Sequence, residues 1–599
     1  MPSKKSVNLF PFSPSPIQRK LLKSVYKCLE ERGILFLEAP TGAGKTLISI
    51  SASLSYARER GLKVIYVSRT HRECQKSLNE IDKIRRKTGR YIKSLIIGGK
   101  SRFCPFILNE GFPLNLLKCK LLRSLDLCPY YRRFLEDMGD LIRSINLENT
   151  FIDLSRIKAC PYYVARLMID LCDLISMPYF YIFGHGSFDL LFKSTTISPL
   201  QSILIVDEAH NLIDFVFQTN KLSLSIKEVD KAIKESKKLN LHLEKPLSNL
   251  RSFFLKTDKM NMKAVKEKLF SLYTPLKIAL FPKLKNLLLK RSSFYPRNIC
   301  KILLFTQEAL KPSGQIIRNV FVRRSPPSII IAPVKISDFI QNIITPFYAI
   351  LFVSATLSPI FIYDAIFGVN KIKKRYKRGI HLTTNFLYDN VKSYVIKNIG
   401  TCFYERSRTM FEKIALSISA IFKKHAINGL IAFFPSRKMA ESVLDLIPEQ
   451  YKELTLKEEE LLAAGDLELK IRKFVEDKGK IMVFSVAGGR LAEGVDIGVL
   501  DSVCVVGIPL PPPTLEMQIK AKLFENELSL NRGEAKTYSY IIPAFNKLIH
   551  AIGRVLRGPN RPIKLFLLDE RYLLNKYRGL LPSWIREEIK VLDVNRLIS

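Results

Sequence analysis

One short loop constrains the fold of this chain more than any other segment. The apolar run Ile34–Leu37 predicts a buried strand, and after Glu38 it leads into Ala39-Pro40-Thr41-Gly42-Ala43-Gly44-Lys45-Thr46. Helical periodicity then continues to about Ala57. A strand, a glycine-rich loop ending in Gly-Lys-Thr and a helix are, in this order, the parts of a phosphate-binding loop. The segment therefore predicts an α/β domain that binds a nucleoside triphosphate.

The residue types of the loop suit that ligand. Glycines let backbone N–H groups approach phosphate oxygens, and the N-terminus of the following helix adds a positive dipole. We expect the Lys45 ammonium to contact the β- and γ-phosphates and the Thr46 hydroxyl to ligate Mg²⁺. The first glycine of the general pattern is replaced by Ala39. The expected nucleotide contacts are Thr41, Gly42, Ala43, Gly44, Lys45 and Thr46.

A second apolar run ends in two carboxylates. Ile203–Val206 predicts a buried strand and is followed by Asp207-Glu208-Ala209-His210. Open α/β sheets bind ligands at the carboxyl ends of their strands. There Asp207 suits a Mg²⁺ ligand, and Glu208 suits the residue that orients or deprotonates the attacking water. An isolated Asp-Glu pair is usually a solvated strand end, but a phosphate-binding loop on the same chain favours the catalytic interpretation.

The second half of the chain repeats the α/β rhythm without a phosphate-binding loop of its own. Its predicted strands are Leu430–Phe434, Ile481–Ser485, Val503–Gly507 and Leu565–Leu568. Further on, Gly553-Arg554-Val555-Leu556-Arg557 places two arginines on one face of a helix. Arg554 and Arg557 are therefore candidates to stabilise charge on a transferring phosphoryl group, as arginine fingers do. The alternative is a pair of surface arginines.

Taken in order, these segments resemble a superfamily 2 helicase of the XPD/DinG family. The further motifs that carry the resemblance are Phe10–Gln18, Ser68-Arg69-Thr70-His71, Ser354–Pro359, Ala432–Ser436 and Glu493-Gly494-Val495-Asp496. The resemblance spans nearly the whole chain. It implies that Gln18 reads the adenine and that ATP lies between two lobes, with Asp496, Arg554 and Arg557 on the second. His550 departs from the family, whose last motif normally has glutamine there.

The first of two long insertions contains four cysteines spaced C-x14-C-x8-C-x31-C, namely Cys104, Cys119, Cys128 and Cys160. Four thiolates can hold a tetrahedral Zn²⁺ or an iron–sulfur cluster, and plain buried thiols are a third alternative. The absence of close C-x2-C pairs weighs against zinc. By resemblance, the four positions match the [4Fe–4S] domain of the family. The other six cysteines are expected to be packing residues.

The second insertion, residues 215–335, has a predominantly helical pattern and a strong basic excess. Between residues 221 and 330 there are 24 Lys and Arg against 7 Asp and Glu. The insertion occupies the position of the family's Arch domain, and the match is one of position alone. The alternative is a basic helical domain whose charge serves only solubility.

The sequence thus predicts an α/β fold of two RecA-like P-loop NTPase lobes, with a four-cysteine iron–sulfur insertion and a helical Arch-like insertion in lobe one. The expected parts are lobe one at 1–100, 166–214 and 336–375, the iron–sulfur domain at 101–165, the Arch-like insertion at 215–335 and lobe two at 376–599.

By resemblance we expect an ATP-dependent DNA helicase that moves 5′ to 3′ on single-stranded DNA and unwinds duplex in DNA repair or genome maintenance. Its expected cofactors are ATP, Mg²⁺ and a [4Fe–4S] cluster, and its expected partners are single-stranded and forked DNA. The net charge of +40 fits a polyanionic partner. Two other classes stay open. An RNA helicase would share the nucleotide motifs, and a single-strand-binding subunit could use ATP only as a switch, without unwinding.

The chain shows no sign of a membrane partner. No apolar run reaches the ~18 residues of a membrane-spanning helix, and Met1-Pro2-Ser3-Lys4-Lys5 leads into no apolar signal core. We therefore expect an intracellular protein, located in the cytoplasm or nucleoid of a prokaryote or in the nucleus of a eukaryote.

Overall fold

The computed structural model describes residues 9–40, 42–100, 104, 114–139, 159–184, 186–256, 261–289, 295–311, 316–373, 377–381, 390–462, 467–489, 491, 497–556 and 562–598. The chain divides into two compact units. The first takes in the described residues up to Leu37, from Thr46 to Ile380 and from Lys522 to Ser529. The second takes in the described residues of Glu38–Lys45, His381–Ala521 and Leu530–Ser599.

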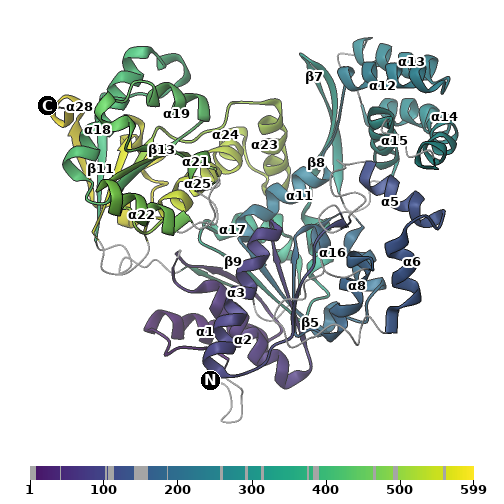
Figure 1. Cartoon of the computed structure of the whole chain (residues 1–599), viewed down its shortest axis with the longest axis horizontal. Coiled ribbons are helices and arrows are strands. Elements are labelled where there is room, and N and C mark those ends of the chain that lie inside the picture. The colour runs from purple at the N-terminus through teal and green to yellow at the C-terminus, as the bar shows by residue number, and fades with distance from the viewer. Residues whose placement is uncertain are drawn as a thin grey trace. The chain divides into compact units, whose positions relative to one another are not determined.

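The first unit is built on a seven-stranded sheet with the order β10-β1-β9-β5-β2-β4-β3 (Figure 1). Its strands are β1 (Ile34–Glu38), β2 (Lys63–Ser68), β3 (Ser94–Ile96), β4 (Leu174–Pro178), β5 (Ser202–Asp207), β9 (Ala349–Ser354) and β10 (Lys377–His381). The strand β5 runs parallel to both β2 and β9. All residues of β1, β5 and β9 are buried, which explains why these strands read as continuous apolar runs. The two carboxylates that follow the apolar run of β5 are thereby placed in the middle of the sheet.

Helices connect these strands. They are α1 (Pro16–Glu30), α2 (Lys45–Arg60), α3 (His71–Thr88), α9 (Phe180–Phe183), α10 (Ser187–Lys193), α11 (Leu212–Asn220), α16 (Ser337–Ile344) and α17 (Ile360–Ile366). The helix α3 begins with a capping box between Thr70 and Glu73, and Gly89 ends it in the left-handed conformation. The Ser-Arg-Thr-His motif therefore marks the point where β2 passes into α3.

The described residues of the four-cysteine insertion form three short helices, α5 (Leu114–Ser124), α6 (Pro129–Glu136) and α8 (Pro161–Met168). Both α6 and α8 begin with the same four residues, Cys-Pro-Tyr-Tyr, and the cysteine stands at the N-cap in each. Proline suits the first helical position because it has no N–H to leave unsatisfied. The repeated tetrapeptide is therefore a repeated helix start.

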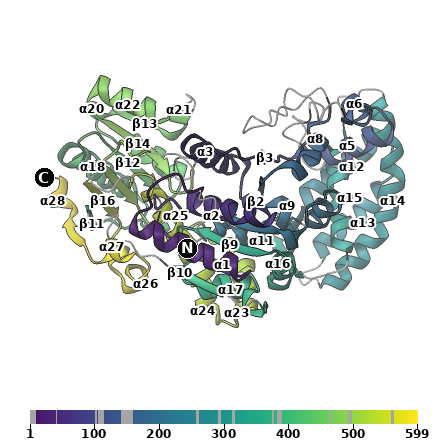
Figure 2. The same ribbon diagram turned by 90° about the horizontal axis from the view of Figure 1, so that it is seen from below.

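In the described part of the second insertion, β6 (Leu222–Ser225) is followed by the helices α12 (Ile226–Leu239), α13 (Glu244–Lys256), α14 (Met262–Leu289) and α15 (Arg297–Leu310). Their buried leucines share one hydrophobic cluster, and Figures 1 and 2 both show the four helices gathered together. The structure also contains a feature that the helical pattern does not predict, an antiparallel sheet of β6, β8 (Pro327–Lys335) and β7 (Ile317–Arg324). Two of its strands follow the helical region in sequence, and β6 precedes it.

The C-terminal part of a helix from the second half of the chain also belongs to the first unit. In α23 (Leu515–Leu528), the Glu527 carboxylate accepts hydrogen bonds from the backbone N–H groups of Ile336 and Ser337, the latter at 2.7 Å. These N–H groups open α16, so Glu527 caps that helix and complements its dipole. Residues 522–529 are grouped with the first unit.

The second unit has its own seven-stranded parallel sheet, with the order β13-β14-β12-β15-β16-β11-β17. Its strands are β11 (Val391–Lys397), β12 (Gly429–Phe434), β13 (Thr455–Lys457), β14 (Ile481–Val486), β15 (Ser502–Val506), β16 (Ile563–Leu568) and β17 (Ile589–Asp593). The four strands predicted in this half of the chain correspond to β12, β14, β15 and β16.

Helices cover both faces of this sheet. They are α18 (Arg408–His425), α19 (Arg437–Leu444), α20 (Glu449–Lys452), α21 (Glu458–Leu462), α22 (Leu467–Lys478), α24 (Arg532–Lys536), α25 (Ile542–Ile552), α26 (Asn575–Arg578), α27 (Ser583–Arg586) and α28 (Val594–Ile598). Leu430 and Phe434 of β12 pack in one hydrophobic cluster, whereas Ile431 and Phe433 pack in another. This alternation buries both sides of the strand, as in a doubly wound α/β domain.

Five of the six cysteines expected to serve as packing residues are buried, namely Cys28, Cys74, Cys172, Cys300 and Cys504. The sixth, Cys402, is half-buried. Within the described residues, no helix combines the length and the apolar character needed to cross a membrane.

Candidate active site

The candidate site of the first unit lies at the carboxyl edge of its sheet. The parallel register pairs Val67 with Val206 and Asp207 with Val353. The ends of β2, β5 and β9 therefore lie next to one another. The Ser-Arg-Thr-His, Asp-Glu-Ala-His and Ser-Ala-Thr segments, which are far apart in sequence, meet at this one edge, where open α/β sheets bind their ligands.

The phosphate-binding loop joins β1 to α2. Gly42 and Gly44 have φ values of 87° and 80°, a backbone region that glycine adopts without a steric cost. The Lys45 ammonium donates hydrogen bonds to the carbonyl oxygens of Ala39 and Pro40, at 2.6 and 2.9 Å. The start of the loop is thus hydrogen-bonded to the side chain of the lysine at its end. The predicted contact Thr41 lies outside the described residues, and Thr46 stands in the first turn of α2.

The Asp207 carboxylate is buried and held by a tyrosine. The Tyr66 hydroxyl, which comes from β2, donates a hydrogen bond to Asp207 Oδ2. A second hydroxyl, that of Tyr179, donates to the backbone carbonyl oxygens of Asp207 and Glu208. Both tyrosines are fully buried. Sequence reasoning missed them, and the only available signal was a tyrosine inside the otherwise aliphatic run of β2.

The turn after β5 is also connected to the end of β9. Glu208 has a left-handed backbone with φ 48°, which is uncommon for a residue other than glycine. His210 Nδ1 lies 3.5 Å from Glu208 Oε2 and 2.8 Å from the Ser354 hydroxyl. The same hydroxyl accepts a hydrogen bond from the Thr356 backbone N–H, at 3.1 Å. The Asp-Glu-Ala-His box is therefore hydrogen-bonded to the Ser-Ala-Thr segment.

A third carboxylate, Glu73, lies close enough to interact electrostatically with this pair. Burial raises the pKa of Glu73, and the negative charges of Glu208 and Asp207 raise it further, against the opposing effect of Lys76. Its side chain also accepts a hydrogen bond from the Thr70 N–H in the cap of α3. Sequence reasoning did not single out Glu73, because a capping glutamate is common and its proximity to β5 is set by the sheet.

Gln18 has a structural task in α1. Its side-chain oxygen accepts a hydrogen bond from the Ser15 N–H at 3.0 Å, while its own N–H donates to the Ser15 hydroxyl at 3.3 Å. This capping box fixes the orientation of the carboxamide expected to read the adenine.

In the second unit, Arg554 follows α25 and is only 6% exposed. Its carbonyl oxygen accepts a hydrogen bond from the Ile497 N–H at 3.3 Å, which connects the arginine segment to the chain directly after Asp496. His550 is also buried. Arg557 and Asp496 themselves lie outside the described residues.

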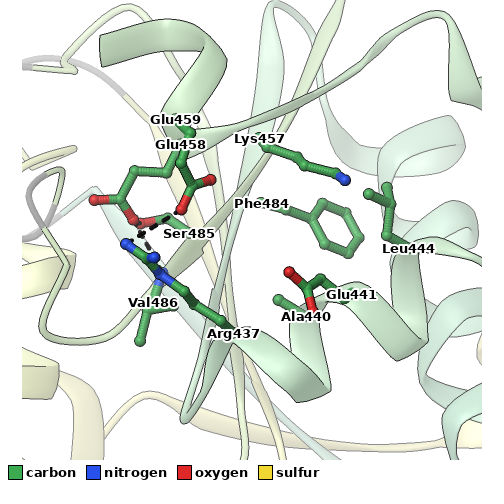
Figure 3. Close-up of a pocket in the computed structure, with 10 residues that line it drawn as sticks. All are labelled: Arg437, Ala440, Glu441, Leu444, Lys457, Glu458, Glu459, Phe484, Ser485 and Val486. Carbon is green, nitrogen blue, oxygen red and sulfur yellow. Dashed lines mark hydrogen bonds and ion pairs between the residues drawn. The ribbon is translucent and has the colours of Figure 1, made fainter. Parts of the chain in front are cut away.

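A pocket in the second unit is formed between α19, the start of α21 and the end of β14 (Figure 3). Its central acid is Glu458, which is 6% exposed and accepts hydrogen bonds from the Ser485 hydroxyl at 2.8 Å and from the Leu491 N–H at 3.1 Å. Figure 3 shows Arg437 pointing toward Glu459, and the ion pair measures 3.3 Å. Because Ser485 precedes and Leu491 follows the Gly488-Gly489 turn, the hydrogen bonds to Glu458 hold both sides of this turn.

The four cysteines of the insertion are half-buried electrostatic neighbours. Burial raises the pKa of the Cys160 thiol, and the charges of Cys128 and Cys104 raise it further. Burial also raises the pKa of Cys128, with a contribution from Cys119. Backbone N–H groups at the starts of α6 and α8 point toward these two sulfurs and oppose the increase. Such N–H groups stabilise thiolates that bind a metal centre.

Among the described residues, the cysteine sulfurs are not gathered as closely as the ligands of a zinc ion. A tetrahedral Zn²⁺ site with Zn–S bonds of about 2.3 Å brings its sulfurs to within about 4 Å of one another. In the described part of the chain, no three cysteine sulfurs all lie within 4.8 Å of one another.

The fold and this edge of the sheet define a P-loop nucleoside triphosphatase of two parallel α/β units. Three family models match the chain: the DEAD/DEAH box helicase at residues 15–103, DEAD_2 at residues 66–230 and the helicase C-terminal domain at residues 418–588. The matched segments contain the phosphate-binding loop, the Asp-Glu-Ala-His box and the arginine segment.

Similar proteins extend over nearly the whole chain. ATP-dependent DNA helicase XPD of Sulfolobus acidocaldarius is 27% identical, covering 93% of this chain and 95% of its own. The general transcription and DNA repair factor IIH helicase subunit XPD/RAD3 of Saccharomyces cerevisiae is 22% identical, covering 98% and 90%. A solved XPD helicase structure has the same fold, with a TM-score of 0.63, 23% identity and coverage of 97% and 100%. The chain is an XPD/DinG-like superfamily 2 helicase, an enzyme that uses ATP and Mg²⁺.

Proposed function

We propose that the protein is an ATP-dependent DNA helicase that moves 5′ to 3′ along single-stranded DNA and unwinds duplex in DNA repair or genome maintenance. The observation that carries the proposal is the sheet edge where His210 links Glu208 to the Ser354 hydroxyl, on a chain similar over 93% of its length to a protein named as a DNA helicase. The direction of movement rests on the family resemblance.

The residues of the phosphate-binding loop and of the Asp-Glu-Ala-His box suit the hydrolysis of Mg·ATP. A buried carboxylate, Asp207, and a hydroxyl, Thr46, are the oxygen ligands that Mg²⁺ prefers. When bound, Mg²⁺ neutralises charge on the β- and γ-phosphates. Lys45 and the backbone N–H groups of the loop hold these phosphates, and Glu208 orients the attacking water. In the second unit, Asp496 contributes to nucleotide binding, while Arg554 and Arg557 act as arginine fingers.

The four-cysteine domain is proposed to hold a [4Fe–4S] cluster. The absence of close C-x2-C pairs in the sequence and the N–H groups aimed at Cys128 and Cys160 support a cluster over zinc. The simplest role of the cluster is structural, because α5, α6 and α8 are too short to form a sizeable core of their own.

Single-stranded and forked DNA are the proposed partners, held by basic and aromatic side chains on the two insertions. Exposed lysines line one face of α12 at Lys227, Lys231, Lys234 and Lys238. Phosphate contacts of this kind bind without sequence preference. The proposed location follows the substrate, namely the nucleoid of a prokaryote or the nucleus of a eukaryote.

The deciding experiment compares the unwinding of matched duplexes that carry a 5′ or a 3′ single-stranded tail, with protein purified without air. We expect ATP-dependent unwinding from the 5′ tail only. Unwinding from the 3′ tail would overturn the polarity, and stronger ATPase stimulation by single-stranded RNA than by DNA would favour an RNA helicase. ATPase activity stimulated by DNA with no unwinding from either tail would contradict the proposed unwinding.

The substitution Lys45→Ala serves as the active-site control. We expect it to abolish ATP hydrolysis and leave single-strand binding largely intact, because the lysine contacts phosphates of ATP and not of DNA. An unchanged rate of ATP hydrolysis would contradict the assigned role of the loop.

A further inference from the structure

Two buried tyrosines hold the turn that carries Asp207 and Glu208, and neither is explained by packing alone. Tyr66 lies on β2 and Tyr179 directly follows β4, so the turn after β5 is held from two other strands. Both side chains are fully buried. A phenylalanine at either position would fill the same space without the hydroxyl. We therefore expect the two hydroxyl groups to have a specific function at this turn.

Tyr66 acts on the carboxylate. In the parallel register Tyr66 pairs with Ile205, and its hydroxyl reaches two residues further along β5 to donate to Asp207 Oδ2. Its hydrogen bond fixes the plane of the carboxylate.

Tyr179 acts on the backbone. Its single hydroxyl meets two consecutive carbonyl oxygens, those of Asp207 and Glu208, and the second distance is 3.0 Å. Two carbonyl groups converge in this way only if the chain turns sharply, and Glu208 provides the turn with its left-handed φ of 48°. Such a backbone costs of order 1 kcal/mol or more for a residue other than glycine. The hydroxyl offsets this cost.

The position of Tyr179 is itself well determined. Its backbone N–H donates to the Ser68 carbonyl oxygen at 2.7 Å, and its ring packs edge-on against Phe215 and Phe183, with centroids 5.5 and 6.2 Å away. It therefore connects the ends of β2, β4 and β5 into one rigid support.

We propose that Tyr66 and Tyr179 are positioning residues of the active site, with separate tasks. Tyr66 orients the Asp207 carboxylate for the Mg²⁺ of Mg·ATP, and Tyr179 sets the backbone turn that aims Glu208 at the attacking water. The inference rests on the roles proposed above for Asp207 and Glu208. Outer-shell partners of metal ligands commonly change metal affinity by about 10–100-fold when removed.

The test compares Tyr66→Phe and Tyr179→Phe in the full chain, because each removes one oxygen atom and keeps the ring. Tyr181→Phe is the matched control, since Tyr181 is also buried and its hydroxyl donates to the Gly98 carbonyl oxygen at 2.8 Å. One readout is the Mg²⁺ concentration that half-saturates binding of a fluorescent ATP analogue. The second is kcat for ATP hydrolysis, and the third is the melting temperature.

We expect Tyr66→Phe to raise the half-saturating Mg²⁺ concentration about tenfold or more. We expect Tyr179→Phe to lower kcat about tenfold while the Mg²⁺ requirement stays within about twofold of wild type. Tyr181→Phe should change neither. If Tyr66→Phe or Tyr179→Phe matches Tyr181→Phe in Mg²⁺ requirement and kcat, and differs from wild type only in melting temperature, the tyrosine has a structural role and its assignment is overturned.

A failure of the proposed function would give a different result from a failure of the positioning roles. A wild-type protein that neither hydrolyses Mg·ATP nor responds to DNA would contradict the proposed function itself. A wild type that does both, with a Tyr66→Phe variant of unchanged Mg²⁺ requirement, would contradict only the positioning role.

Discussion

Gly488 and Gly489 are neighbours in the second unit, yet the space around them differs. A Cβ atom on Gly489 would lie 2.4 Å from Glu458 Oε2, whereas one on Gly488 would meet only the Lys547 Cδ atom at 3.9 Å. Glu458 is buried and accepts hydrogen bonds from both sides of this turn. At the scale of a residue, therefore, only the second glycine is required by its surroundings.

We expect Gly489→Ala to destabilise the second unit by about 1–3 kcal/mol, because the methyl group must displace a buried, hydrogen-bonded carboxylate. It should also lower ATPase activity, since the turn leads toward Asp496. Gly488→Ala is the control and should be nearly neutral. Thermal melting and ATPase assays measure both effects, and equal effects of the two alanines would contradict this account.

Arg554 is buried, and this excludes for it the alternative of a surface arginine. If it acts as an arginine finger, Arg554→Ala should lower kcat by about 10³-fold or more. Binding of single-stranded DNA should remain. The exposed Arg578 on α26 is a suitable control, and its alanine variant should hydrolyse ATP at the wild-type rate. A loss of less than about tenfold at Arg554 would argue against a finger.

At the scale of elements, the helices of the second insertion are joined by polar contacts as well as by a shared core. Lys301 of α15 pairs with Glu228 in the first turn of α12. Burial opposes the ionisation of Glu228, but the Lys301 ammonium and the Ser225 N–H and hydroxyl outweigh it, so its pKa is lowered from 4.5. The two helices are thereby linked at one end by a carboxylate whose ionised form is stabilised by its surroundings.

This shift predicts a pH dependence of stability. A carboxyl group with a lowered pKa in the folded state stabilises the fold above its unfolded pKa of about 4.5, and this contribution is lost as pH falls through the folded value. Lys301→Met should therefore lower the melting temperature at pH 7 and have less effect near pH 3. The loss should stay below about 1 kcal/mol, because Lys301 is 40% exposed. Lys263→Met on α14 is the control and should show no such pH dependence.

At the scale of the whole molecule, the net charge of +40 favours binding to a polyanion whose affinity depends on salt. The logarithm of the binding constant for single-stranded DNA should fall linearly with that of the salt concentration, by about 0.7 per phosphate contact. We expect at least a hundredfold loss between about 50 and 200 mM salt, measured by fluorescence anisotropy. A binding constant that hardly changes would assign the affinity to base stacking and not to charge.

The local pattern of apolar residues was sufficient to predict part of the fold. The strands β12, β14, β15 and β16 were predictable because each is a short apolar run, and the alternating burial of Leu430–Phe434 follows from the pleat. The antiparallel sheet β6-β8-β7 was not predictable in the same way. The helices α12–α15 separate β6 from β7 and β8 in sequence, so the pairing of β6 with β8 depends on how the whole insertion folds back.

The amino-acid sequence by itself determined the chemistry proposed for the site. Residue type and order are enough to indicate it, in the glycines before Gly-Lys-Thr, the carboxylates after a buried strand and the four spaced thiols. Tertiary structure alone decided which side chains support that chemistry. Tyr66 and Tyr179 reach Asp207 and Glu208 from other strands, and Glu527 caps a helix that begins almost two hundred residues earlier in the chain. Local periodicity does not predict such contacts, because they depend on sheet order and packing. They do not depend on the residues that are neighbours in sequence.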